Sequence, residues 1–539
     1  MNHGEMKHGS ETFWIEGEGL LSTQVGGRSG DQADPVDAGS TRKASARALA
    51  KAEAPPFRFS RTGPRGTPLN ARIVRKLARA MVVGGGGTGT IPAGYTYLGQ
   101  FVDHDLTMDH TSVMLGEEVS PADLLQGRSP RLDLDSLYGA GPGNAESAKF
   151  YSDGLHLKVG STVPAQGIPS KPGHDLPRVG KGADLAAQQK ALIPDPRNDE
   201  NLIVAQTHLA MIRFHNKVAD RTPASLPANQ RFARARKLVT LHYQWMLRHD
   251  YLPRICEPAV VEDVWTNGRK LVEPAAAPTD VPTMPIEFSV AAFRLGHSMI
   301  RSEYNWNAEF PGVAGSLDYM FSFSALGGDL GGEKRLLSSW IADWRRMYDF
   351  PAAGKPGLAA PSSGVNRAMR IDTRLSDPLG FLPPSTFGGD DSVPPMPRNL
   401  AFRNLTRAGM VNLASGQQMV NILRKRGVVV PALTRAQVLE GNGGAKLDHL
   451  TAAERTAIAS RTPLWFYVLR EAEINDGRLT GVGARIVAET LHRAMEGSHF
   501  SIVRDPTFVP RLGPRRGTFE MTDLLFFTFG NKAELAPAG

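Results

Sequence analysis

The chain of 539 residues contains a single cysteine, Cys256. No disulfide can form within one molecule, so the fold cannot depend on an oxidising compartment. The surrounding stretch, YLPRICEPAV, carries no signature of a nucleophilic thiol. We therefore expect Cys256 to be buried and unreactive.

Long apolar runs are also missing. No stretch is long and apolar enough to cross a bilayer, and the N-terminal segment lacks the basic start and apolar centre of a signal peptide. We expect no transmembrane segment. The location stays open between the cytoplasm and export by a route that needs no signal peptide.

Positive charge exceeds negative charge only mildly, with 62 basic against 54 acidic residues and a net charge of +8. No basic run with interleaved aromatic residues is present, so we expect no nucleic-acid partner. Hydrophobic residues make up 41% and charged residues 22%, which is typical of a globular protein.

Strand-like alternation is scarce, whereas helical periodicity recurs along the chain. We predict a mostly α-helical protein with long Pro/Gly-rich loops, in which residues 1–60 are a flexible leader and residues 61–530 form one large domain. The glycine-rich stretch GGGGTGT, from Gly84 to Thr90, lacks the ending of a phosphate-binding loop and is interpreted as a flexible connector.

The first stretch whose residues could take part in catalysis or binding is YLGQFVDHDLT, from Tyr97 to Thr107. Acids and a histidine inside an apolar run are costly to bury unless they are paired or bind something. On a helix, Gln100, His104 and Thr107 share a face, Asp103 lies beside His104, and Asp105 points elsewhere. A core histidine with satisfied hydrogen bonds is the alternative interpretation.

The second stretch, SPRLDLDSLYG, places Asp133 and Asp135 at alternate positions downstream of Ser129. Hard oxygen ligands of this kind suit Ca²⁺, although the spacing excludes an EF-hand. Taken alone, a polar turn is the simpler interpretation.

In two further stretches, charged residues lie beside apolar ones. In IPDPRNDENL, Asp195 is predicted to cap a helix with Pro196 at its first position, so that Arg197 and Glu200 share a face; a surface ion pair is the alternative. In FSVAAFRLGH, Arg294 and His297 lie three apart among apolar residues. A histidine on an apolar helix is a candidate axial ligand for haem iron, with a core histidine as the alternative.

In their order and character, GQFVDHD, the R-x-x-E pair and AFRLGH together resemble the animal-type haem peroxidase superfamily, which includes myeloperoxidase, peroxidasin and the cyclooxygenases. The resemblance runs from about residue 92 to about residue 500. The later stretches PRNLAFRNLTRAGMVNLASGQ and TPLWFYVLREAEINDGRLTGVGARIVAETL are similar to bacterial members. The resemblance implies the animal haem peroxidase fold, with haem held between a distal and a proximal helix.

The resemblance also implies roles for individual residues. His104 resembles the distal histidine, Gln100 its neighbour, and Arg197 the distal arginine. His297 resembles the proximal iron ligand, Asn404 the acceptor of its hydrogen bond, and Arg294 the arginine facing a haem propionate. Asp103 and Glu200 lie where ester bonds to haem form. A calcium site would take Asp105, Ser129, Asp133, Asp135 and the backbone carbonyl of Arg131. Asn201 follows Glu200 where myeloperoxidase has a methionine, so a sulfonium link is not expected.

The implied function is that of a haem peroxidase with haem b and Ca²⁺, serving in the response to oxidative stress. Such an enzyme reduces hydrogen peroxide through a ferryl intermediate and oxidises an organic donor or a halide. A cyclooxygenase-like fatty-acid dioxygenase is one alternative, but its tyrosine one turn before the proximal histidine is replaced here by Arg294. A peroxinectin-like adhesion protein is the other, and it would be marked by loss of His104, Arg197 or His297.

Overall fold

The computed structural model describes residues 57–538 except for positions 83, 85, 109–114, 120–125, 311–314, 363 and 384–391. The leader predicted for residues 1–60 falls almost entirely outside this range and stays a prediction. Within the range, structure begins at once, because β1 (Phe59–Ser60) pairs in parallel with β5 (Met284–Pro285) and Phe59 is fully buried.

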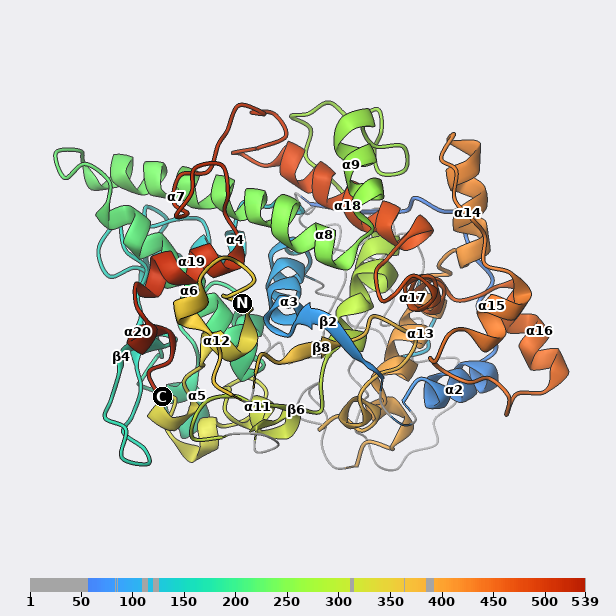
Figure 1. Cartoon of the computed structure of the whole chain (residues 1–539), viewed down its shortest axis with the longest axis horizontal. Helices are drawn as coiled ribbons and strands as arrows, with labels where there is room; N and C mark the ends of the chain where they lie inside the picture. The colour runs from blue at the N-terminus through green and yellow to red at the C-terminus, as the bar shows by residue number, and fades with distance from the viewer. Residues whose placement is uncertain are drawn as a thin grey trace.

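Helices dominate the described part of the chain, as predicted (Figure 1). The longer ones are α2 (Ala71–Ala80), α3 (Gly94–Leu106), α6 (Leu202–Asp220), α7 (Ala228–Met246), α9 (Pro258–Asn267), α13 (Leu400–Met410), α14 (Gly416–Lys425), α16 (Ala452–Ser460), α17 (Leu464–Ile474), α18 (Gly481–Gly497) and α19 (Met521–Phe529). Shorter ones include α4 (Asp135–Tyr138), α5 (Leu185–Gln189), α8 (Leu252–Ile255), α10 (Gly296–Met299), α11 (Leu317–Ser322), α12 (Trp344–Met347), α15 (Arg435–Glu440) and α20 (Lys532–Leu535).

Side-chain caps define many of the helix starts. The Asn201 side chain accepts a hydrogen bond from the Val204 amide at the start of α6. Helices α14, α15 and α16 each begin with a capping box, in which a serine or threonine and a residue three positions on satisfy each other's backbone amides. Caps of this kind fix where each helix begins.

Strands are short and, among the described residues, come in two-stranded pairs. Besides β1 and β5 these are β2 (Thr88–Pro92) with β8 (Arg367–Met369), β3 (Gly160–Ser161) with β4 (Pro172–Asp175), and β6 (Glu303–Tyr304) with β7 (Gly315–Ser316), all antiparallel. The interpretation of Gly84–Thr90 as a flexible connector was therefore wrong in part. A Cβ on Gly89 would lie 3.1 Å from the Ala368 carbonyl oxygen, so a glycine here permits close pairing with β8.

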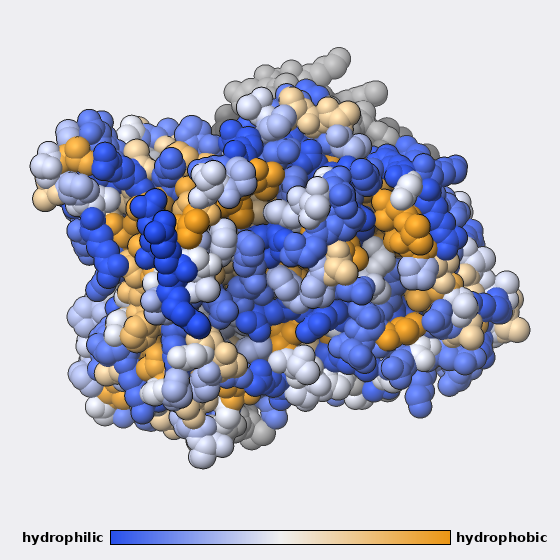
Figure 2. Space-filling view, turned by 45° about the horizontal axis from the view of Figure 1, so that its top comes forward, coloured by the Kyte–Doolittle hydropathy of each residue, from blue (hydrophilic) through white to orange (hydrophobic). Residues whose placement is uncertain are grey.

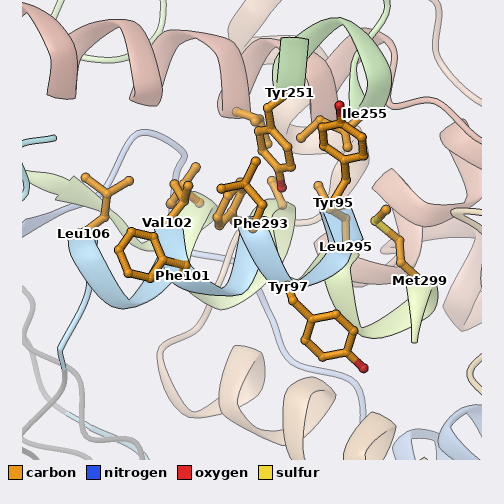
Figure 3. Close-up of a cluster of buried hydrophobic side chains, with 14 of the residues drawn as sticks. Tyr95, Tyr97, Phe101, Val102, Leu106, Tyr251, Ile255, Phe293, Leu295 and Met299 are labelled. Atoms are coloured by element: carbon orange, nitrogen blue, oxygen red, sulfur yellow. The ribbon is translucent and has the colours of Figure 1, made fainter. Parts of the chain in front are cut away.

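Helix α3 runs through the middle of the molecule (Figure 1), and eleven of its thirteen residues are buried. Figure 3 shows its aromatic and aliphatic side chains packed against Tyr251 of the neighbouring helical segment and against Leu295 and Met299 of the segment that carries His297. Gly94 and Gly99 allow this close packing, because a Cβ at either would lie 2.3 Å from the ring of Tyr348 or the hydroxyl of Tyr251. The face seen in Figure 2 is mostly hydrophilic, with small hydrophobic areas between.

Two predicted continuous helices are interrupted. Asp195 caps a 3₁₀ turn, η3 (Pro196–Asp199), and the chain leaves the helix before α6 starts. The segment before His297 is wound as a π turn, η5 (Glu287–Ala291), then a 3₁₀ turn, η6 (Ala292–Leu295), then α10. Such irregular turns re-aim side chains and are frequent at functional sites.

The expectation that Cys256 is buried is confirmed. Cys256 is fully buried, and burial raises the pKa of its thiol well above the usual range. Across the described residues, none of the helices combines the length and the apolar character needed to span a membrane.

Candidate active site

His104 lies buried near the C-terminal end of α3, with both ring nitrogens near polar partners. Its Nδ1 is 2.9 Å from the Oδ1 of Asn198, and its Nε2 is 3.6 Å from a carboxylate oxygen of Glu200. Thr107 was predicted to share the helix face of His104. That prediction was wrong, because Thr107 is extended and its backbone amide and hydroxyl both bond to the Asp103 carbonyl.

The guanidinium of Arg197 is tied to the end of α3. It donates to both carboxylate oxygens of Asp195, at 3.0 and 2.8 Å, and to the backbone carbonyls of His104 at 3.0 Å and Thr107 at 2.6 Å. Arg128 donates to the same carboxylate at 2.5 Å. Burial acts to raise the pKa of Asp195, but the two guanidinium groups outweigh it and hold that pKa well below its usual range.

Glu200 faces the His104 ring, and Gln100 in turn contacts Glu200. The Gln100 side-chain amide donates to the same Glu200 oxygen that faces His104, and Asn201 donates to the Gln100 carbonyl oxygen at 3.0 Å. Asp103 is half-buried, and one of its oxygens accepts from the Thr107 hydroxyl at 3.2 Å. Gln100 and His104, predicted for the distal side, are therefore gathered with Glu200, predicted as a site of an ester bond.

His297 lies on α10, which packs against α3. Its Nδ1 is 2.8 Å from the side-chain nitrogen of Asn404 on α13. The Asn404 side-chain oxygen is buried without a partner in the described structure. Turning this amide over would let that oxygen accept from Nδ1–H, and oxygen and nitrogen of an amide are interchangeable in shape. The residues present thus fit a histidine whose Nε2 binds a metal.

Arg294 lies one turn before His297 and is buried. Its Nε donates to the Ser289 carbonyl at 2.9 Å, and its own carbonyl accepts from the indole of Trp465 at 3.2 Å. The Trp465 ring also lies edge-on to the His297 ring, with centroids 6.4 Å apart. Arg294 and Trp465 therefore fix the turn from which His297 projects.

The predicted calcium ligands share a region but their oxygens do not converge. Asp105 accepts from the backbone amides of Leu134 and Ser136, both at 3.2 Å, whereas the Asp133 carboxylate accepts from the His499 amide at 2.9 and 3.0 Å. Arg236 donates to Asp135. No group of three His, Cys, Asp or Glu side chains in the described part of the chain is arranged to hold a metal ion.

Two observations in that region still favour a cation. Burial, and then the negative charge of Asp135, raise the pKa of Asp105 to about 7. The Ser129 hydroxyl is buried without a hydrogen-bond partner in the described structure. Arg131, expected to contribute only its carbonyl, is half-buried nearby in sequence. Calcium binding stays a prediction.

Three residues around His104 were not predicted from the sequence (Asn198, Arg128 and His208), and Asp195 was predicted only as a helix cap. Asn198 bonds the His104 ring, and Asp195 and Arg128 anchor Arg197. His208 on α6 is fully buried, neither of its ring nitrogens has a hydrogen-bond partner in the described structure, and burial lowers its pKa to about 3. The pattern R-N-D-E did place Asn198 beside Arg197, but a lone asparagine in a short turn gives no signal of its target.

Comparison with known proteins now bears on this arrangement. Residues 100–318 match the family described as animal haem peroxidase. Residues 100–318 are therefore similar to an animal haem peroxidase domain. This segment includes His104, Arg197 and His297, whereas Asn404 and the later stretches that resemble bacterial members lie outside it.

Among curated proteins, the domain is 28% identical to thyroid peroxidase of Mus musculus over 195 residues, which is 34% of this chain and 20% of that protein. It is 24% identical to Heme peroxidase 2 of Caenorhabditis elegans over 230 residues, covering 40% of this chain and 29% of that protein. The matched stretches therefore span less than a third of these relatives.

Solved structures support the same fold. Peroxidase A from Dictyostelium discoideum aligns with a TM-score of 0.50 and 14% identity, over 82% of this chain and 88% of that one. The fatty acid alpha-dioxygenase of Oryza sativa aligns with a TM-score of 0.51 and 12% identity, over 86% and 77%. The predicted animal haem peroxidase fold is thus confirmed over most of the chain.

Proposed function

We propose that the chain binds haem b between α3 and α10, with His297 as axial ligand, and reduces hydrogen peroxide while it oxidises a small-molecule donor or a halide. The observation that carries the proposal is a matched pair of histidines on two packed helices. His104 and His297 each present Nδ1 to an asparagine amide, Asn198 and Asn404 respectively. Each Nε2 is thereby directed away from that amide.

Bound haem would supply the redox-active iron at which the O–O bond of peroxide breaks. With the Asn198 oxygen as acceptor, the proton of neutral His104 lies on Nδ1, and Nε2 is left as a base. His104 then takes the proton from the attacking peroxide oxygen and returns it to the leaving oxygen, which departs as water. Glu200, with an oxygen 3.6 Å from Nε2, stabilises the protonated ring as long as it is a free carboxylate; the ester proposed below would remove that charge.

Arg197 has a positioning role in this scheme and also supplies positive charge. Its bonds to the carbonyls of His104 and Thr107 hold the end of α3, so that Nε2 keeps its place. Its positive charge favours the negative charge that develops as the O–O bond breaks. Because Asp195 neutralises part of that charge, the positioning role is the larger one.

Asp103 and Glu200 are proposed to form ester bonds to haem, and Arg294 to face a propionate. Acidic organic extraction tests the esters: haem should stay with the unmutated protein and be released from Asp103→Val/Glu200→Gln. Complete release from the unmutated protein would remove this part of the proposal. Asp105, Ser129, Asp133, Asp135 and the Arg131 carbonyl would hold Ca²⁺ when it is bound, which would keep α3 rigid.

The alternatives have less support. A fatty-acid dioxygenase would need a tyrosine where Arg294 stands, and the likeness to a dioxygenase structure concerns the fold alone. An adhesion protein without catalysis would not need His104, Arg197 and His297, and all three are present.

Steady-state oxidation of a phenolic donor by the haem-loaded protein tests the function. His104→Leu should lower kcat/KM for hydrogen peroxide by about 100-fold or more, the contribution typical of a positioned acid–base group. His156→Leu, a histidine paired with Asp153 near the surface, is the matched control and should change it little. Equal activity of both variants would contradict the role of His104.

A further inference from the structure

A cleft of about 680 Å³ lies outside the site described so far, between the region from η2 (Ala148–Phe150) to β3, the segment after β4 and the loop at residues 334–335. Six basic side chains line it, and we call it the basic cleft: Lys149, Lys158, Arg178, Lys181, Lys334 and Arg335. Its volume is within the range of sites that hold small organic molecules. No acidic residue is among its lining residues.

Arg178 at the back of the basic cleft is already neutralised. It donates to Asp175 at 2.7 Å and also to Asp199, and its side chain is only 4% exposed. The other five cations behave differently: in the described part of the chain none of them forms an ion pair with a carboxylate. Lys149, Lys181, Lys334 and Arg335 are exposed. Five uncompensated positive charges around one hollow repel one another and attract an anion.

The wall of the basic cleft is apolar. Val159, Leu176, Pro177, Val179 and Leu192 line it. Val159 is 42% exposed, which is unusual for a large aliphatic side chain in this protein, and Leu176 is fully buried beneath. An inorganic anion would leave this surface in contact with water, whereas a ligand with an apolar body would cover it.

We propose that the basic cleft binds a small organic anion with an apolar body, such as an aromatic sulfonate or carboxylate. The acidic group lies among the lysines and Arg335, and the body lies against Val159 and its aliphatic neighbours. This binding does not depend on peroxidase activity. The back wall of the basic cleft is nevertheless connected to the segment that carries Glu200, because Arg178 also forms an ion pair with Asp199, the residue before Glu200.

Isothermal titration calorimetry of the full, haem-loaded chain with 2-naphthalenesulfonate tests the proposal. One site is expected, with at least tenfold weaker binding of 2-naphthol, which lacks the charge, and of inorganic sulfate, which lacks the apolar body. Raising the salt from 50 mM to 500 mM should weaken binding of the sulfonate, because salt screens exposed charges.

Variants locate the site. Lys181→Glu/Arg335→Glu should weaken binding of the sulfonate at least tenfold, whereas Lys425→Glu/Lys446→Glu makes the same change of net charge outside the basic cleft and should leave it within twofold. Lys425 ends α14, at the opposite end of the molecule from β4 (Figure 1). Val159→Ser should weaken sulfonate binding and leave sulfate binding unchanged.

Three results would overturn the proposal. One is equal binding by the two charge-reversal variants. Another is equal affinity for 2-naphthol and the sulfonate. The third is binding of a sulfated polysaccharide at the basic cleft with none of the sulfonate, which would assign the surface to a polyanion. All four side chains in the charge-reversal pairs are exposed, so these variants should fold, as circular dichroism can verify.

Discussion

The two histidines of the site are held in different ways. His104 lies in a dense network: Asn198 and Glu200 contact its ring, Gln100 and Asn201 extend that contact, and the helix end that carries it is bonded to Arg197. His297 sits on a helix of four residues, where Asn404 bonds to its ring and the Trp465 ring lies edge-on to it.

This difference corresponds to the work that each side would do. A proton-transferring base must keep its position without support from a metal, so its surroundings have to be rigid. A metal ligand is positioned in part by the bond to the metal itself, and one hydrogen bond is enough to set its tautomer. Substitutions around His104 should therefore disturb its position, whereas substitutions around His297 should mainly change its properties as a ligand.

Removing the proximal ligand should have the largest effect. His297→Ala is expected to abolish haem retention or peroxidase turnover, because α10 carries no other histidine. Haem content from the Soret absorbance per protein, together with turnover, checks this. His449→Ala changes an exposed histidine and serves as control. Full haem content with unchanged turnover in His297→Ala would exclude His297 as the ligand.

Removing the Asp195 carboxylate, which anchors Arg197, should have the second-largest effect. Asp195→Asn leaves the guanidinium groups of Arg128 and Arg197 buried without their shared carboxylate, which costs about 3 kcal/mol of unfolding free energy. The rate of reaction with peroxide should fall together with it, because Arg197 no longer holds the end of α3. Denaturant unfolding gives the first quantity and rapid mixing with peroxide the second.

Asp153→Asn is the control for that loss, since the Asp153 carboxylate is 58% exposed and should matter little to stability. A variant at Asp195 that is as stable and as fast as the unmutated protein would show that the network around His104 is not anchored there.

The hydrogen bond between Asn404 and His297 should tune the iron without unfolding the protein. Asn404→Asp offers a stronger acceptor to His297, makes it a more basic ligand and should lower the Fe(III)/Fe(II) reduction potential; Asn404→Leu should raise it. Spectroelectrochemical titration measures both. Potentials that do not move, or that move the same way, would remove Asn404 from this role.

The last prediction concerns the pH dependence of stability and a carboxyl far from both histidines in sequence. Burial, opposed only in part by the amides of Val482 and Gly483, raises the pKa of Glu471 to about 8. The folded state therefore binds a proton more tightly than the unfolded state, so stability is full at low pH and is lost as pH rises from about 4.5 to about 8, by at most about 1.4 kcal/mol per pH unit. Glu471→Gln should flatten that slope in unfolding experiments; an unchanged slope would contradict it.

Much of the site was predictable because the motifs are local. Gln100, His104 and Glu200, and separately His297 with Asn404, were predicted from short stretches and lie together in the structure. The environment of Arg197 was not predictable, because two of its partners are backbone carbonyls at the end of α3, about 90 residues earlier in the chain, and that contact depends on tertiary packing. The helix interruptions were missed for a related reason: hydrophobic periodicity continues through a 3₁₀ or π turn.

The most direct test of the account is stopped-flow mixing of the haem-loaded protein with hydrogen peroxide, followed at the Soret band. We predict a fast loss of Soret absorbance that an electron donor reverses, and a rate at least 100-fold lower in His104→Leu. A haem spectrum that does not respond to peroxide, or a rate that is the same in both proteins, would contradict the proposed pairing of His104 with a haem bound at His297.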